Sequence, residues 1–470
     1  MSLARTWQAY PASYRAKEMA VLMRCILAGE SGSVIGLSGA GKSNLLGFLC
    51  HRPDVLHAFS PHNTPSVVPV LVDFNNLPSN DLAMLFRVIL RALYEARQQL
   101  AVVDESLAQT AELYYRRVEE KTDPFLSQSA LREVLYAFRD RNTRLVLVLD
   151  PFEPFCRSAT SQVLDNVRGL RDSFKDTLSY VVGLRKELAG IRDPADMGEL
   201  YEILDMHKCY IGAMTPEDAR WVIDQVKETT GYAFSETQAA RLAELSGAYP
   251  SLLRATSMWL TGLPSPPEAE WTECLLAEPS VQYRLEELWT GLEEDEQRAL
   301  SAVGRLPSGR QSSRDGVLAA LRQQHDEAPV RLSNLGLCEA RGERWYVCSE
   351  LLARYASDAA QQTMDEILLN EETGELTCGQ VPLTNLTPLE YEALLFFVRH
   401  PQVRHTKIDL ILNAWPNDPC PLERTDDSIY QVIRGLRRKI EPNPSKPRYI
   451  VTWRGTQPRE GGYQFFPQGQ

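Results

Sequence analysis

The sequence predicts an α/β protein: a parallel β-sheet with flanking helices, then a helical domain, then two smaller domains of helices and β-hairpins. Three observations lead to this prediction. A glycine-rich stretch at residues 36–43 lies between a short apolar run and a helical segment. Further apolar runs alternate with amphipathic segments up to about residue 187, which is typical of parallel sheets with helical crossovers. The segment after residue 372 instead contains capped helices followed by two strand-like runs.

The composition is that of a globular protein with several domains. The chain has 470 residues, 44% hydrophobic and 24% charged, enough for about three domains of ~150 residues. No apolar run reaches the ~20 residues that span a bilayer, and the N-terminus lacks the apolar core of a signal peptide. The nine cysteines form no C-x-x-C pair, which disfavours a metal site or a disulfide framework.

The charge is distributed unevenly along the chain. The net charge is −12, which taken alone disfavours nucleic acid as a partner. From Cys420 onward, however, nine Lys and Arg stand against five Asp and Glu, so this segment carries +4 and the remainder −16. A basic tail on an acidic body suggests a local contact with nucleic acid.

The glycine-rich stretch Gly36–Ser43 fits the pattern G-x-x-x-x-G-K-[S/T], in the strand–turn–helix context that this motif requires. Backbone N–H groups of such a loop surround phosphate oxygens, and the helix N-terminus adds partial positive charge. We expect Lys42 to reach the terminal phosphates and Ser43 to bind Mg²⁺. The expected nucleotide contacts are Gly36, Ser38, Gly39, Ala40, Gly41, Lys42, Ser43 and Asn44.

The first domain continues in order around this motif. A helix is expected over residues 10–30, a buried strand over 67–74, and long helices over 81–100, 107–120 and 127–140. The next apolar run, Leu145–Asp150, ends in a carboxylate, which can hold the Mg²⁺ water shell opposite Ser43. Pro151 follows, and the next acid is Glu153. Either Glu153 takes the catalytic role or hydrolysis is slow.

A further buried strand over residues 178–185 ends in Arg185. This side chain either senses the γ-phosphate or is a solvated arginine after a strand. Beyond residue 187 the pattern becomes helical, with helix starts capped by Thr215 and Ser235. The proline-rich stretch at residues 263–267 predicts a domain boundary.

Together these pieces resemble the STAND/AAA+ class of P-loop ATPases with a NACHT-like core, over roughly residues 10–358. The matching positions are Gly36–Ser43, Asp150, Arg185 and the glycine-to-proline element Gly247–Pro250. The resemblance implies ATP or ADP as cofactor with Mg²⁺, and a contact between Pro250 and the adenine. Read by itself, the element at Pro250 is equally well a helix junction. We expect the ATPase core over residues 1–190 and a helical lid over 191–264.

Residues 265–358 resemble the winged-helix domain that follows the lid in STAND proteins, where it regulates nucleotide exchange. The residues that carry this resemblance are Leu285, Leu288, Trp289, Leu292, Glu296, Leu300, Leu332–Leu337 and Trp345–Val347. A linker is expected over residues 359–371. The sensor repeats usual in STAND proteins do not follow residue 358.

The C-terminal segment, residues 372–470, predicts three helices and a hairpin. Capped starts occur at Thr387 and Thr406, and a third helix over about 428–440 carries one buried stripe of isoleucine and leucine. At ~100° per residue, the face opposite this stripe presents several polar side chains. These are Gln431, Arg434 and Arg438, with Arg437 at the margin.

This segment resembles the OmpR/PhoB-type winged helix-turn-helix, through Leu386–Tyr391, Leu436–Lys439 and Thr452–Tyr463. The resemblance implies a third helix in the DNA major groove and a hairpin wing at the minor groove. The expected DNA contacts are Gln431, Arg434, Arg437, Arg438, Arg454 and Arg459. Val432 and Gly435 stand where the family often has base-reading residues, so binding through phosphates with reduced base specificity is expected.

Residues Thr406–Asp409 match the guanine-reading signature [N/T]-K-x-D of GTPases. They lie far beyond the nucleotide-binding sheet, within the winged helix, where helix capping explains them. ATP is therefore preferred over GTP.

These observations lead to the hypothesis of a slow, Mg²⁺-dependent ATPase that acts as a switch for DNA binding in bacterial transcription or defence. The expected partners are double-stranded DNA, further copies of the chain on ATP binding, and an unknown protein activator, with no membrane. The expected location is cytoplasmic and nucleoid-associated. Two alternatives remain open: an initiator-like AAA+ machine that remodels DNA, and a scaffold in which the nucleotide is structural.

Overall fold

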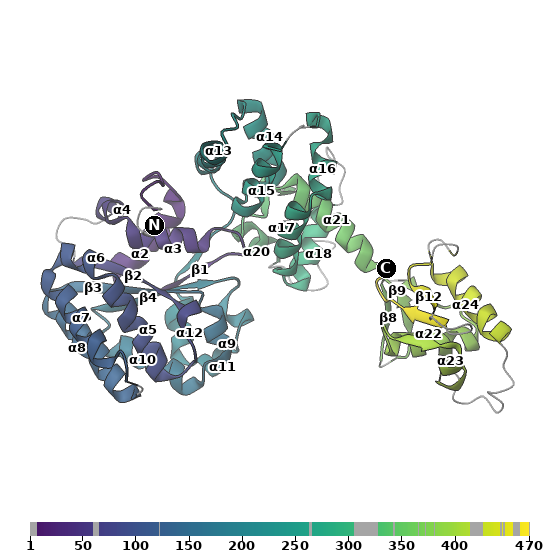
Figure 1. The fold of residues 1–470 in the computed structure, drawn as a ribbon, viewed down its shortest axis with the longest axis horizontal. Coiled ribbons are helices and arrows are strands. Elements are labelled where there is room, and N and C mark those ends of the chain that lie inside the picture. The colour runs from purple at the N-terminus through teal and green to yellow at the C-terminus, as the bar shows by residue number, and fades with distance from the viewer. Residues whose placement is uncertain are drawn as a thin grey trace. The chain divides into compact units, whose positions relative to one another are not determined.

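The computed structural model describes residues 7–469 except 60–64, 122, 263–265, 305–327, 342–343, 365, 372, 380, 414–425, 442–443, 445–446 and 455–460. The chain forms two compact units, Met1–Tyr355 and Ala356–Gln470, each described by itself (Figure 1). Helix α21 (Glu350–Met364) begins in the first unit and ends in the second. Among the described residues, no helix combines the length and apolar character needed to cross a bilayer.

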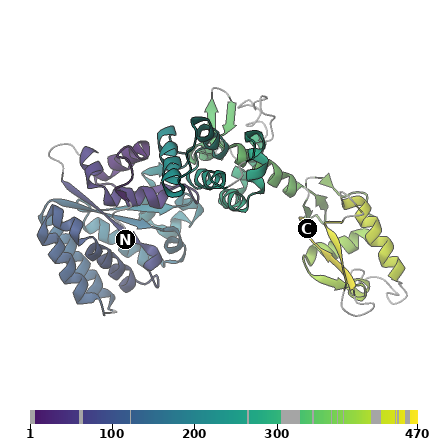
Figure 2. The ribbon, with the colours of Figure 1, turned by 45° about the horizontal axis from the view of Figure 1, so that its top comes forward.

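The first unit is built on a five-stranded parallel sheet with the order β2-β3-β4-β1-β5. The strands are β1 (Gly32–Ile35), β2 (Ser66–Asp73), β3 (Thr143–Asp150), β4 (Leu178–Leu184) and β5 (Lys208–Tyr210). Helices cover both faces of the sheet (Figure 2), and β4 is buried along its whole length. The predicted parallel sheet with flanking helices is confirmed. The three-residue strand β5 was not expected, because three residues are too few to show the alternation of apolar and polar side chains that predicts a strand.

The helices of this unit follow the amphipathic segments. They are α2 (Ala16–Ala28), α3 (Lys42–His51), α4 (Pro53–Phe59), α5 (Leu82–Glu95), α6 (Arg97–Val103), α7 (Glu105–Val118), α8 (Pro124–Asp140), α9 (Glu153–Ser158), α10 (Ser161–Ser173), α11 (Pro194–Met197) and α12 (Glu199–Asp205), with the 3₁₀ turns η1 (Phe74–Asn76) and η2 (Leu188–Gly190). Side chains of α5, α7, α8 and α10 form one buried cluster with the sheet. The helix predicted over 81–100 is two helices that meet at Ala96.

Three helices follow the sheet and form the region expected as the lid. They are α13 (Pro216–Thr230), α14 (Glu236–Ser246) and α15 (Pro250–Leu260). The two predicted caps are present: Thr215 accepts from the N–H of Asp218, and Ser235 forms a capping box with Gln238. Thus α13 and α14 begin where their side-chain oxygens satisfy the first free N–H groups.

The post-lid segment, residues 268–347, contains short helices and one hairpin. Its elements are η3 (Glu268–Glu270), α16 (Trp271–Ala277), α17 (Pro279–Thr290), α18 (Glu294–Gly304), α20 (Ala328–Asn334), β6 (Cys338–Arg341) and β7 (Arg344–Val347). Strands β6 and β7 pair antiparallel. The segment packs tightly on the sheet, since a Cβ on Gly212 would lie 1.9 Å from the carbonyl oxygen of Leu335. It belongs to the same compact unit as the sheet, and its being a separate winged-helix domain stays a prediction.

The described residues of the second unit form two small antiparallel sheets and three helices, in addition to the end of α21. Its elements are β8 (Ile367–Leu369), β9 (Leu376–Cys378), β10 (Val381–Pro382), α22 (Pro388–Arg399), β11 (Arg404–Thr406), α23 (Lys407–Asn413), α24 (Asp426–Ile440), β12 (Ile450–Arg454) and β13 (Gly461–Phe465). The sheets have the orders β10-β9-β8 and β11-β13-β12. The end of α21 and strand β8 fall within residues 359–371, the range expected as a linker.

Reciprocal caps begin two of the helices in the second unit. Thr387 and Glu390 form a capping box at α22. At α23 the N–H of Thr406 donates to Asp409, and the N–H of Asp409 donates to the Thr406 hydroxyl. These bonds account for the guanine-like signature as a helix cap, as expected from the sequence.

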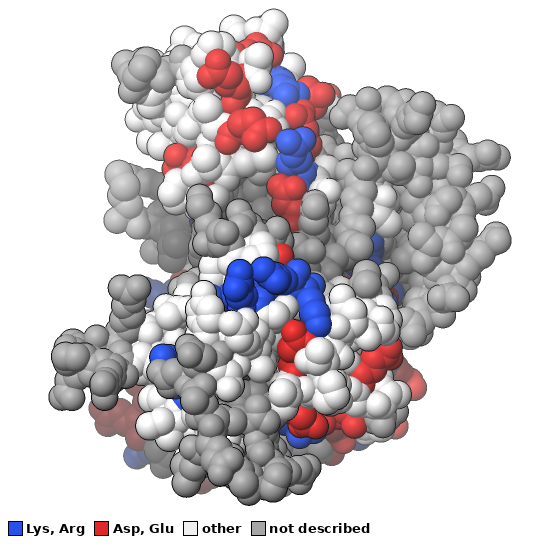
Figure 3. All heavy atoms as spheres, turned by 90° about the vertical axis from the view of Figure 1, so that its right-hand side faces the viewer, with Lys and Arg blue, Asp and Glu red and all other residues white. Residues whose placement is uncertain are grey.

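Helix α24 buries one face and exposes the other. The buried stripe is Ile429, Ile433, Leu436 and Ile440, and the exposed side chains include Gln431, Arg434 and Arg438. Figure 3, seen from the side on which α24 lies in Figure 1, shows Lys and Arg side chains gathered in one patch. A Cβ on Gly435 would lie 2.1 Å from a carboxylate oxygen of Glu390. A larger residue there would displace the Glu390 carboxylate, which caps α22.

Arg15 connects three parts of the first unit from a fully buried position, with 1% of its surface exposed. Its guanidinium donates to the backbone carbonyls of Ala40 at 3.1 Å, Gly212 at 2.8 Å and Ala213 at 3.0 Å. Its own backbone N–H donates to the carboxylate of Asp218 on α13 at 3.3 Å. The side chain of Arg15 thus connects the glycine-rich loop with the chain after β5 at the sheet edge. The backbone of Arg15 connects the same region with lid helix α13.

We predict that Arg15→Ala lowers the free energy of unfolding by about 2–4 kcal/mol, because three backbone carbonyls lose their donor and the carboxylate of Glu18 loses its ion-pair partner at 2.9 Å. Thermal or urea unfolding of the purified protein measures this. Arg24→Ala removes an exposed arginine from α2, the helix that Arg15 precedes, and should change stability by less than about 0.5 kcal/mol. Equal effects of the two substitutions would contradict the assigned role of Arg15.

Candidate functional site

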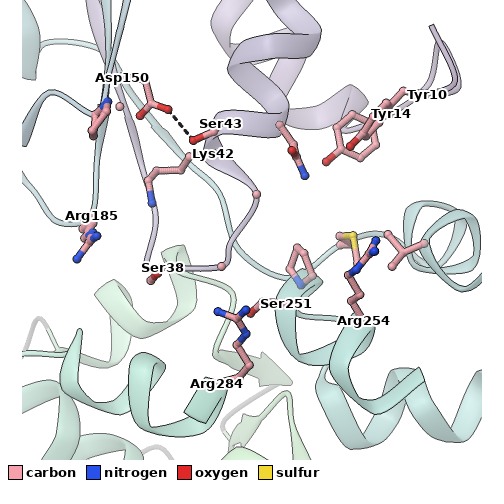
Figure 4. Close-up of a pocket in the computed structure, with 18 of the residues that line it drawn as sticks. Tyr10, Tyr14, Ser38, Lys42, Ser43, Asp150, Arg185, Ser251, Arg254 and Arg284 are labelled. Carbon is pink, nitrogen blue, oxygen red and sulfur yellow. Dashed lines mark hydrogen bonds between the residues drawn. The ribbon is translucent and has the colours of Figure 1, made fainter. Parts of the chain in front are cut away.

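A cavity of about 970 Å³ opens in the first unit at the carboxyl ends of the strands. The glycine-rich loop, the ends of β3 and β4, lid helices α13 and α15, and α17 all contribute to its lining. Figure 4 shows Asp150, Lys42 and Arg185 toward one end and Tyr10 and Tyr14 toward the other. The carboxyl edge of a parallel sheet is where ligands of such proteins bind.

The glycine-rich loop has a backbone that residues with side chains could not adopt. Gly39 and Gly41 have φ of 73° and 92°, in the left-handed region. A Cβ on Gly39 would also lie 2.2 Å from the hydroxyl oxygen of Ser251. The loop leads directly into the N-terminus of α3. This cradle of backbone N–H groups fits the phosphates of a nucleotide.

Lys42 extends back along the loop that precedes it. Its ammonium donates to the carbonyls of Gly36 at 2.5 Å and Leu37 at 3.1 Å. Burial lowers the pKa of Lys42 to about 8, while the carboxylate of Asp150 opposes this shift. A phosphate group at the loop would stabilise the charged form further and raise the pKa. The Lys42 ammonium therefore lies at the loop, where a phosphate would stabilise its charge.

Ser43 and Asp150 meet across the cavity, as predicted. The Ser43 hydroxyl donates to a carboxylate oxygen of Asp150 at 2.6 Å (Figure 4). A hydroxyl and a carboxylate at this place fit a hydrated Mg²⁺ bound to phosphates. Gly183 makes room for the carboxylate, because a Cβ there would lie 2.2 Å from an Asp150 oxygen. Within the described residues, no group of three His, Cys, Asp or Glu forms a metal-ligand set by itself.

Glu153 stands at the start of α9 and is held by two donors. Arg157 donates to one carboxylate oxygen at 2.6 Å, and the backbone N–H of Arg185 donates to the other at 3.2 Å. All three residues line the cavity. Both oxygens of Glu153 thus already have partners, which limits its use as a base for water. The side chain of Arg185 lies on the phosphate side of the cavity (Figure 4).

The far end of the cavity is aromatic. The ring centroids of Tyr10 and Trp221 lie 4.3 Å apart, and those of Tyr10 and Tyr14 lie 4.6 Å apart. Burial raises the pKa of Tyr14 to about 12, so its hydroxyl stays protonated. Pro250 also lines the cavity. Flat aromatic surfaces suit a nucleobase. Trp221 was missed from the sequence, where it is only one apolar position of an amphipathic helix.

Helix α17 brings a second group to the loop that the sequence did not indicate. The hydroxyl of Ser38 donates to a carboxylate oxygen of Glu287, and Arg284 donates to the other oxygen at 2.8 Å. Arg284 lines the cavity. Ser38 and Glu287 are 249 residues apart in sequence, so no local pattern could have linked them.

The residues expected to contact DNA occupy different environments. Gln431, Arg434 and Arg438 are exposed on α24. Arg437 is half-buried: its guanidinium donates to the carbonyl of Ile450 at 2.6 and 3.0 Å and to the hydroxyl of Thr452 at 2.9 Å. Burial lowers its pKa. Arg437 therefore fixes α24 to the hairpin. The side chains of Arg454 and Arg459 lie outside the described residues.

The geometry of the first unit is that of a P-loop NTPase. Residues 14–344 match the family described as Novel STAND NTPase 1, and residues 380–465 match the family described as Transcriptional regulatory protein, C terminal. Because the first match covers well over half of the chain, the protein belongs to the Novel STAND NTPase 1 family. The expected STAND-type nucleotide-binding region and the OmpR/PhoB-type winged helix are both confirmed.

Curated transcriptional regulatory proteins are similar to a limited part of the chain. The chain is 32% identical over 105 residues to transcriptional regulatory protein YvrH of Bacillus subtilis, covering 22% of this chain and 40% of the relative. It is 40% identical over 70 residues to the alkaline phosphatase synthesis transcriptional regulatory protein SphR of Synechococcus elongatus, covering 15% and 26%. The chain thus spans two fifths or less of the length of these relatives.

Two solved structures with similar folds each cover 73% of this chain. The Walker-type ATPase of Pyrococcus abyssi has a TM-score of 0.45 at 13% identity, covering 73% of this chain and 95% of that one. The ORC2 protein of Aeropyrum pernix, in ADPNP and ADP complexes, has a TM-score of 0.38 at 14% identity, covering 73% and 92%.

We predict that nucleotide affinity falls about tenfold between about pH 7 and about pH 9, because Lys42 loses its proton through a pKa of about 8 and only the charged form pairs with phosphate. The direction follows from the lowered pKa: affinity is full below it and decreases as the pH rises through it. Titration with a fluorescent nucleotide measures this, with circular dichroism to verify that the fold persists. Affinity that stays constant over this range would contradict the lowered pKa.

Proposed function

We propose that the protein is an ATP-dependent switch that couples nucleotide binding to the engagement of double-stranded DNA by its C-terminal unit, as a bacterial transcription or defence regulator. The observation that carries this proposal is the presence, in one chain, of a complete phosphate site and an OmpR/PhoB-type winged helix. Helix α21 joins the two units without an intervening domain. A conformational change in the first unit therefore has a short covalent route to the second.

ATP with Mg²⁺ is the ligand proposed for the cavity. Gly36, Gly39, Ala40, Gly41 and Asn44 would surround the phosphates together with the Lys42 ammonium, while Ser43 and Asp150 would hold the cation. The cation held by Ser43 and Asp150 would supply positive charge against the phosphates. The aromatic end, with Pro250 beside it, would take the adenine.

Slow hydrolysis suits this proposal. Pro151 occupies the position after Asp150, and Glu153 is held by Arg157 and by the backbone of Arg185. A carboxylate with both oxygens paired is poorly available to orient water. Arg185 remains a candidate γ-phosphate sensor. The ATP-bound state would then persist long enough to act as a signal.

DNA contact is proposed for the exposed face of α24, through Gln431, Arg434 and Arg438. Arg437 would act mainly by holding the helix against the hairpin, since its guanidinium is already occupied. Arg454 and Arg459 are proposed contacts of the wing. Phosphate contacts by arginine would provide affinity with limited sequence selectivity.

We predict that Lys42→Ala abolishes ATP binding and removes any effect of ATP on DNA affinity, while DNA affinity without nucleotide stays at the wild-type level. Isothermal titration calorimetry and fluorescence anisotropy on a labelled duplex measure the two quantities. Lys17→Ala, which removes an exposed lysine of α2, is the matched control and should leave both unchanged. Retained ATP affinity in Lys42→Ala would refute the assigned site.

We predict that replacing Arg434 and Arg438 together by alanine weakens binding to a non-specific duplex and reduces the slope of log affinity against log salt by about two units, one for each lost phosphate contact. The control is Arg399→Ala, an exposed arginine at the end of α22, for which no change is expected. An unaltered salt slope in the double variant would locate DNA binding elsewhere.

The alternative of a DNA-remodelling ATPase predicts brisk turnover stimulated by DNA, whereas the switch predicts slow turnover that DNA changes little. A structural scaffold predicts bound ADP that survives purification and no salt-dependent DNA affinity. Phosphate release measured with and without duplex DNA separates the first two, and the paired state of Glu153 favours the switch.

A further inference from the structure

Helix α17 reaches the phosphate-binding loop from the post-lid segment with an acid and a base one turn apart. Glu287 accepts a hydrogen bond from the Ser38 hydroxyl, and Arg284 pairs with Glu287 at 2.8 Å while lining the cavity. Figure 4 places Ser38 at the turn of the loop, with Arg284 projecting from α17 toward the cavity. A carboxylate thus lies at a loop whose expected ligand is an anion.

Glu287 acts on this loop as a negative charge. Burial alone would raise its pKa, but the hydrogen bonds from Ser38 and Arg284 lower the pKa overall, so the carboxylate is ionised at neutral pH. Its field also reaches Lys42, where it counteracts part of the lowering of the ammonium pKa by burial. Glu287 therefore raises the pKa of Lys42, which is the effect that a bound phosphate would also have.

Further contacts hold the end of α17 against the same region. A Cβ on Gly291 would lie 3.1 Å from the side chain of Leu37 in the loop. Lys186, just after β4, pairs with Glu293 at 2.5 Å. On its other side α17 packs against α21, where the ring centroids of Trp289 and Tyr355 lie 6.4 Å apart. Movement of α17 would therefore be transmitted to the helix that connects the two units.

We propose that the Glu287 carboxylate is a stand-in for a terminal phosphate, and that the γ-phosphate of ATP expels it from Ser38 and takes over Arg284. Two anions cannot share the loop without repulsion, whereas the Arg284 guanidinium can pair with either of them. ADP, which lacks the third phosphate, leaves the Ser38–Glu287 contact in place. Residues Arg284 and Glu287 thus set the preference between ATP and ADP. This inference rests on the nucleotide site proposed above.

The test compares ATP and ADP affinities of Glu287→Gln by calorimetry. Glutamine keeps the shape and the bond to Ser38 but removes the charge, so ATP affinity should rise roughly fivefold or more while ADP affinity changes little. Glu286→Gln makes the same change at the adjacent, exposed position of α17 and should alter neither affinity. Arg284→Gln should have the opposite effect on the ratio, weakening ATP binding more than ADP binding.

Hydrogen exchange of α17 provides a readout apart from affinity. In the wild-type protein ATP should increase exchange in α17 relative to ADP, because the helix loses its bond to the loop. Equal ATP-to-ADP preference in wild type, Glu287→Gln and Arg284→Gln would overturn the inference. The switch itself would survive that result if Lys42→Ala still abolishes binding, whereas nucleotide binding by Lys42→Ala would remove both.

Discussion

One requirement governs the packing around the loop Gly36–Gly41 in the first unit. Backbone N–H and C=O groups of this loop that point away from the cavity must form hydrogen bonds with other parts of the chain. The Arg15 guanidinium donates to the carbonyl of Ala40, and the backbone N–H of Ser251 donates to the carbonyl of Gly39 at 3.2 Å. The N-terminal segment and the lid thus meet at neighbouring peptide groups. The loop is rigid because its back is bonded to parts of the chain that are far apart in sequence.

The loop therefore contacts several parts of the first unit in addition to lining the cavity. A buried guanidinium is costly to desolvate and is stable only when its donors are used. Arg15 satisfies this with three carbonyls from the loop and from the chain beyond β5, while Asp218 binds its backbone from α13. Displacement of the loop would therefore disturb the sheet edge and the lid together. Shared bonding of this kind is what the proposed switch would use to convert a small change at a phosphate into a larger rearrangement.

Much of the fold could be predicted because local patterns carry it. The motif at Gly36–Ser43, the apolar strand ending at Asp150 and the caps at Thr215 and Thr387 each follow from a few adjacent residues. The elements that were missed have no such pattern. Strands β5 and β8–β10 contain two or three residues each, too few to show alternation.

The site residues could be predicted only where they belong to a recognisable sequence motif. Ser43 and Asp150 were expected to face each other across a cation, and they lie within hydrogen-bond distance. Glu287 was missed because an acid on an amphipathic helix is ordinarily a solvated residue, and only the tertiary fold brings it to Ser38. Arg437 shows the converse: its type suggests a DNA contact, yet its position directs it to the backbone of the hairpin.

The energetic requirement for a switch links these features. A ligand can shift a conformational equilibrium only by the difference in its affinity for the two states. ATP and ADP share every contact with the loop except those of the last phosphate, so the discriminating groups must lie where that phosphate would be. In the inference proposed above, these groups are Glu287 and Arg284, which belong to a helix that contacts α21 through Trp289 and Tyr355. Glu153, held by Arg157, fits the slow hydrolysis that the proposed switch requires. Under that proposal, the ATP-bound state would last long enough to act on DNA binding.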